Sequence, residues 1–138
     1  MKSRATLSLT EMLIMVMIFA MAAAACLKVF AWADARSAEI ETTDFAVLQV
    51  SNAAEVMEQA RGDYARAAAL LEAEESAGGG LQIRYDENRE RCADGGAFRL
   101  VVLPVNSVVE LMGEAQVSMM KGDTVIYSLT VCWQEAAA

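Results

Sequence analysis

The feature that most constrains the fold is a stretch with no charged side chain, from Met12 to Leu27. Its residues are mostly Met, Ile, Leu, Val, Phe and Ala, and the apolar character continues past Lys28 to Ala33. A helix over the 22 residues from Met12 to Ala33 is about 33 Å long, which is enough to cross a hydrocarbon core of ~30 Å. The sequence therefore predicts a single membrane-spanning helix within residues 7–33.

Charge is distributed unevenly around this stretch. Lys2 and Arg4 precede it, whereas residues 34–138 carry 8 basic and 18 acidic side chains, a net charge of −10. Basic residues favour the cytoplasmic side of a membrane. We therefore expect a cytoplasmic N-terminus and an extracytoplasmic domain over residues 34–138.

Composition excludes several classes of function. The chain has no histidine, which removes Ser-His-Asp triads, Cys-His dyads and the common zinc sites. Its acidic balance is unsuited to nucleic acid, and no nucleophile has a base partner. One loop has oxygen-bearing side chains at alternating positions: Asp86, Asn88, Glu90 and Asp94. Arginines lie between them, which favours a solvated loop over a calcium site. We expect no catalytic residue, metal or cofactor, and thus no enzyme.

The apolar segment is compatible with three fates. Ala31-Trp32-Ala33 is a small-x-small site, so a signal peptidase cut after Ala33 would release a secreted or membrane-tethered binding domain. Acylation of Cys26 would give a lipoprotein. The third fate is a retained helix, and Glu11 favours it, because a carboxylate at the edge of an apolar span is costly and a cleaved signal gains nothing from it.

Residues 6–14, Thr6-Leu7-Ser8-Leu9-Thr10-Glu11-Met12-Leu13-Ile14, resemble the N-terminus of type IV pilins and of the pilin-like proteins of type II secretion and competence systems. The resemblance implies a short basic leader over residues 1–6, removed by a prepilin peptidase. A cut after Thr6 makes Leu7 the first residue and Glu11 the fifth, which is the position of the family's glutamate. A cut after Ala5 follows a small residue but makes Glu11 the sixth.

The family resemblance also implies a role for Glu11 and a set of partners. Glu11 matches the glutamate that neutralises the free α-amino group of a neighbouring subunit. The implied partners are other pilin-like subunits, a membrane assembly platform protein and the prepilin peptidase.

Beyond the membrane segment the pattern stays helical. No Pro or Gly interrupts residues 5–61, so one helix is predicted to about residue 60, with an apolar stripe: Ile40, Val47, Val50, Ala54 and Met57. Gly62 is expected to end this helix. Asp63 is a predicted N-cap for a second helix from Tyr64 to about Ser76.

Alternation with a period of two follows Gly78-Gly79-Gly80. It predicts about four antiparallel strands, at residues 81–85, 98–105, 114–120 and 125–133, with a hairpin turn at 121–123. On the last strand Val125, Tyr127, Leu129, Val131 and Trp133 are expected on one side. The predicted fold class is α+β, with residues 34–60 of the long helix covering the sheet, as in pilin-like proteins.

Cys92 and Cys132 would both lie outside the membrane, where cysteines can bond. Pilin-like proteins often carry a disulfide in this region, so the pair is predicted either as a disulfide or as two thiols. Together these features predict a structural subunit of a type IV pilus, competence or type II secretion-like filament. The released binding domain is the alternative.

Overall fold

The computed structural model describes residues 2–76, 78–109 and 111–135, with side chains from residue 8 onward. Helix α1 extends from Lys2 to Ala60 without interruption. It ends where Arg61 and Gly62 adopt positive φ angles of 50° and 77°, a conformation that glycine accepts at no steric cost. The predicted end of the helix at Gly62 is confirmed.

A second, short helix follows at once. Helix α2 covers Tyr64–Leu71, and the Asp63 carboxylate accepts a hydrogen bond from the Arg66 backbone N–H at 3.0 Å. The predicted N-cap is therefore confirmed. The helix is shorter than expected, because Glu72 takes a left-handed conformation (φ 50°) and its N–H bonds to the Ala68 carbonyl. The residues beyond it join the sheet instead.

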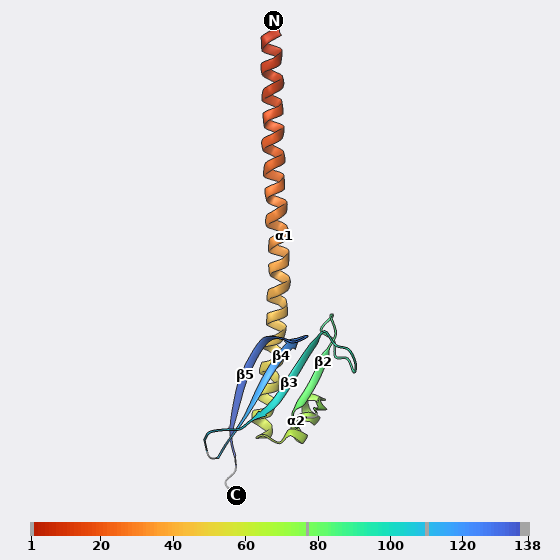
Figure 1. Cartoon of the computed structure of the whole chain (residues 1–138), viewed down its shortest axis with the longest axis vertical. Helices are drawn as coiled ribbons and strands as arrows, with labels where there is room; N and C mark the ends of the chain where they lie inside the picture. The colour runs from red at the N-terminus through yellow and green to blue at the C-terminus, as the bar shows by residue number, and fades with distance from the viewer. Residues whose placement is uncertain (1, 77, 110, 136–138) are drawn as a thin grey trace. The chain divides into compact units, whose positions relative to one another are not determined.

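All strands of the sheet are antiparallel and neighbours in sequence are neighbours in space, as Figure 1 shows. The order is β1 (Glu74–Glu75), β2 (Leu81–Tyr85), β3 (Phe98–Val105), β4 (Met112–Lys121) and β5 (Thr124–Gln134). The four predicted strands are present, and β1 is added as a two-residue edge. The α+β class is confirmed.

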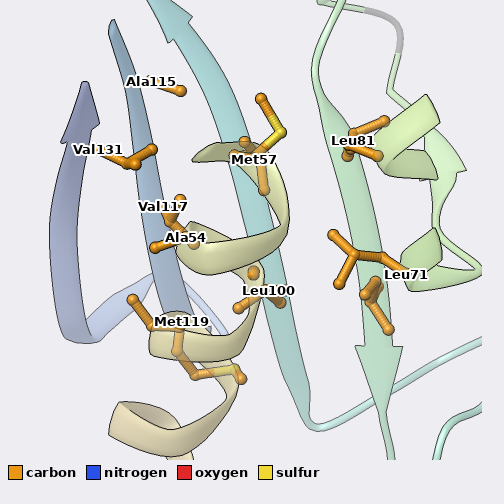
Figure 2. Packing of buried hydrophobic residues seen from close by; sticks show 14 of the residues in the cluster. Ala54, Met57, Leu71, Leu81, Leu100, Ala115, Val117, Met119 and Val131 are labelled. Atoms are coloured by element: carbon orange, nitrogen blue, oxygen red, sulfur yellow. The ribbon is translucent and has the colours of Figure 1, made fainter. Parts of the chain in front are cut away.

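The core lies between the sheet and the last part of α1. Residues four and three apart face the sheet and are buried: Ala46, Val50, Ala53, Met57 and Ala60. They pack on alternate strand residues such as Leu100, Val117 and Met119, each at most 2 % exposed. Figure 2 shows Ala54 and Met57 on the side of α1 that faces β3 and β4. This one-sided burial explains the stripe.

The stripe differs in phase from the predicted one at two positions. Val47 is only partly buried, and Ile40 is 52 % exposed. Contacts divide the chain into one unit to Glu41 and a second from Thr42 onward. Ile40 belongs to the first unit, whereas the buried stripe lies in the second.

A β-bulge changes the face of β5 near its start. The register shifts between Met119 and Met120, which pair with Tyr127 and Val125 and leave Ile126 without a partner. The extra residue reverses the alternation. Val125 is consequently 52 % exposed, which corrects its predicted place on the buried side, whereas Val131 and Trp133 are buried as predicted.

Two glycines make room for the Trp133 indole. A Cβ atom at Gly62 or at Gly113 would overlap the atoms of this ring. Trp133 is 8 % exposed, so the last strand is fixed against both the α1–α2 connection and β4. Glycine is required at both positions for steric reasons.

Candidate functional site

The first candidate site is the apolar segment of α1. From Leu9 to Trp32 every large apolar side chain is more than half exposed, from 57 % at Ile14 to 75 % at Phe19. The segment is long and apolar enough to cross a membrane, and none of its most apolar part is buried by the rest of the chain. Apolar area of this size is unfavourable in water. By length and composition the segment is therefore compatible with a single membrane-spanning helix.

Glu11 is the charged residue at the start of this segment. Its side chain is exposed, and the following sixteen residues carry no charge. One helical turn away on the same face lie Ile14 and Met15. Among the side chains that the structure describes, Glu11 has no ion pair. Removing a carboxylate at this position from water is costly unless an opposite charge compensates it.

The residues predicted for processing are only partly described. Ala5, Thr6 and Leu7 belong to the backbone of α1. Their side chains lie outside the described residues, so the predicted cleavage remains a prediction.

The cysteines do not come together. Cys26, Cys92 and Cys132 are free thiols. Cys92 donates its N–H to the Arg84 carbonyl on β2, whereas Cys132 lies on β5 opposite Glu114. Strands β2 and β5 are three strand spacings apart, about 14 Å, and a disulfide needs Cα atoms within ~6.8 Å.

The two cysteines also lie at opposite ends of the sheet. Phe98 pairs with Tyr85 and with Lys121 at the end nearer Cys92. Cys132 lies at the other end, because Glu114 also pairs with Val105. The sheet order thus separates Cys92 and Cys132, and the structure has the second of the two predicted outcomes, two thiols.

The polar loop between β2 and β3 is held by its own backbone. The Asp86 carboxylate accepts the Glu90 N–H at 2.9 Å, and the Asp86 carbonyl accepts the Arg89 N–H at 3.1 Å. The carboxylate of Asp86 thus closes a turn. Among the described residues no three His, Cys, Asp or Glu side chains form a group that could hold a metal.

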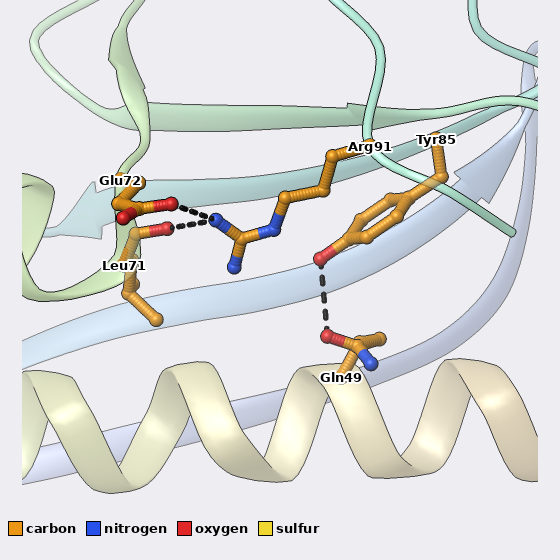
Figure 3. Close-up of polar contacts among 5 residues, drawn as sticks. All are labelled: Gln49, Leu71, Glu72, Tyr85 and Arg91. Carbon is orange, nitrogen blue, oxygen red and sulfur yellow. Dashed lines mark hydrogen bonds and ion pairs between the residues drawn. The ribbon is translucent and has the colours of Figure 1, made fainter.

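Sequence reasoning missed a polar cluster that joins distant elements (Figure 3). The Arg91 guanidinium donates to the Leu71 carbonyl at 2.8 Å and lies 3.3 Å from the Glu72 carboxylate. The Tyr85 hydroxyl donates to Gln49 Oε1 on α1 at 3.0 Å. Burial raises the pKa of Tyr85 even though the Arg91 charge lowers it. No local pattern marks these pairs, because they join residues 19 to 36 positions apart.

Neither known protein families, nor curated proteins, nor solved structures give a significant match to this chain. The resemblance to pilins therefore depends on the N-terminal residues and on a long N-terminal helix packed on an antiparallel sheet. At that level the arrangement is consistent with a pilin-like fold.

Proposed function

We propose that the chain is a structural subunit, similar to a minor pilin or pseudopilin, of a type IV pilus, competence or type II secretion-like filament. The observation that carries the proposal is Glu11, a carboxylate at the start of a helix segment whose apolar side chains the chain itself leaves uncovered. Before assembly lipid would surround this segment, and in the filament neighbouring helices would replace the lipid.

Glu11 would select the packing position in the filament. Removing a charge from water is costly unless an opposite charge and hydrogen bonds compensate. Cleavage of the leader frees an α-amino group at the start of the mature helix. Pairing this ammonium with Glu11 of a neighbouring subunit would compensate both charges and fix the axial stagger between the two helices.

The proposed partners follow from this assembly. They are sister pilin-like subunits, a membrane assembly platform protein and the prepilin peptidase. The proposed location is a single-pass anchor in the cell membrane with residues 34–138 outside it, followed by a surface filament.

N-terminal sequencing of the protein from cells, with and without prepilin peptidase, tests the processing. We expect a mature N-terminus at Thr6 or Leu7 that depends on the peptidase. A mature end at Asp34 would refute the proposal in favour of a released binding domain, and an acylated end at Cys26 would refute it in favour of a lipoprotein.

Substitution of Glu11 tests the assembly role. Glu11→Ala should leave membrane insertion intact but reduce incorporation into filaments about a hundredfold or more. The α-ammonium of the neighbouring subunit would then be buried without a partner, which costs ~3–5 kcal/mol. Ser8→Ala, on the same exposed segment, is the matched control and should incorporate normally. Quantitative immunoblots of sheared filaments and membranes measure both values. Normal incorporation of the Glu11→Ala protein would remove Glu11 from the mechanism.

A further inference from the structure

The two edges of the sheet are built differently. Strand β1 has two residues, both glutamates, and short charged edge strands are a common protection against pairing with another chain. Strand β5 has eleven residues, Thr124–Gln134, and none of them is charged or proline. One edge is therefore protected, and the other offers a long uncharged strand.

The backbone register shows which groups of β5 point outward. The Glu135 N–H bonds to the Leu111 carbonyl at 2.9 Å. In an antiparallel pair, alternate residues direct both backbone groups toward the partner strand. Beyond the bulge the odd-numbered residues therefore bond to β4. The even-numbered residues direct their N–H and C=O groups away from it: Ser128, Thr130, Cys132 and Gln134.

The bulge limits the region available for pairing. It lies opposite Met119 and Met120 and disturbs β5 at residues 125–127. From Ser128 to Gln134 the register with β4 is regular. Among the described residues no strand pairs with the outer side of this stretch.

We propose that β5 pairs antiparallel with β5 of a second copy of this chain, joining two sheets into one. Residues 42–138 carry 7 basic and 15 acidic side chains, a net charge of −8, so two copies of this unit repel each other overall. The strand itself carries no charge, and antiparallel pairing with its own copy brings no charged side chains of the two strands together.

The pattern of outward groups specifies the register. A twofold axis at Val131 places Thr130 opposite Cys132 of the other copy, and Ser128 opposite Gln134. This register uses all four outward-facing residues, with two hydrogen bonds in each pair. A shift of the pairing by two residues leaves outward-facing backbone N–H and C=O groups at the strand ends without a hydrogen-bond partner. The pairing involves the sheet domain alone, so it does not depend on the proposed role of Glu11.

Cross-linking tests the register directly. The test uses full-length protein with Cys26→Ala and Cys92→Ser. In the proposed register, Thr130→Cys places the new cysteine of each copy opposite native Cys132 of the other, with ~5.5 Å between the Cα atoms of each pair. Oxidation by copper-phenanthroline in detergent should give a covalent dimer at least about tenfold more abundant than with Ser118→Cys. Ser118 is the matched control, on the same face but one strand inward. Equal dimer yields would overturn the proposal.

A second variant tests the pairing without cysteine chemistry. Thr130→Pro removes an N–H that points away from β4, so the domain should fold, whereas Thr130→Val keeps this N–H. In a Trp32→Phe background, sedimentation should show dimers for Thr130→Val and monomers for Thr130→Pro, with unchanged Trp133 fluorescence.

Two further results separate this proposal from the filament proposal. The Thr130→Cys cross-link should persist in Glu11→Ala protein, and its loss there would show that α1 drives the contact. Cross-links from Thr130→Cys to a different protein in cells, without self-dimer, would also refute the second copy as the partner.

Discussion

Replacing Met57 by Ala measures how far α1 stabilises the sheet. Met57 is fully buried, and the change removes three heavy atoms beyond Cβ. At ~0.8 kcal/mol per buried group the lost transfer energy is about 2.4 kcal/mol. A residual cavity of roughly 60 Å³ adds about 1.4 kcal/mol at ~24 cal/mol per Å³. We expect the free energy of unfolding to fall by about 3–4 kcal/mol.

Leu48→Ala is the matched control, because it removes the same number of heavy atoms from the same helix. Leu48 is 65 % exposed, so the loss should be about 0.8 kcal/mol with no cavity. Urea unfolding in detergent, followed by Trp133 fluorescence in a Trp32→Phe background, measures both variants. Equal midpoints for the two variants would refute the conclusion that the Met57 side of α1 covers the sheet.

Two other perturbations test packing and polar contacts of the same domain. Gly113→Ala should lower the free energy of unfolding by ~1–3 kcal/mol, because its Cβ would overlap the Trp133 indole. Gly78→Ala, the control, has open space around its Cβ and should change this free energy by less than about 0.5 kcal/mol in the same assay. Tyr85→Phe should lose ~0.5–1.5 kcal/mol with its hydrogen bond to α1, whereas Tyr64→Phe should be neutral or stabilising, because its buried hydroxyl has no partner. Burial raises the pKa of both tyrosines. Ionisation of these two groups therefore leaves the free energy of unfolding unchanged below pH ~10 and lowers it as pH rises through the folded-state pKa values. The double variant should flatten the loss of stability above pH ~10, and an unchanged alkaline slope would contradict this assignment.

The helices and most strands could be predicted because their signals are local. Absence of Pro and Gly predicts a continuous α1, and Gly62 followed by Asp63 predicts its end and the next start. The alternation of Leu81, Ile83 and Tyr85 predicts β2, which is buried in the same alternation. Each of these depends on residues within a few positions of one another.

The structure differs from the sequence-based prediction where contacts between residues far apart in the chain determine the conformation. Helix α2 ends at Leu71 because Glu72 turns left-handed and Glu74 pairs with Gln82 of β2. The Leu71 carbonyl and the Glu72 carboxylate are also held by Arg91, about twenty residues away. Likewise, the bulge at the start of β5 is a property of the pairing with β4, and neither strand alone indicates it.

The two parts of α1 impose different demands on their surroundings, although one helix contains both. Residues from Leu9 to Trp32 expose large apolar side chains in every direction, so no single protein face can cover them. Between Ala46 and Ala60 one stripe of apolar residues is buried completely or nearly so in the core of the sheet domain, whereas Leu48, on another side of the helix, is exposed. The core of the sheet domain is therefore complete without the first segment, which contributes no residue to it. This separation is why the assembly role proposed for Glu11 requires no role of this carboxylate in the fold.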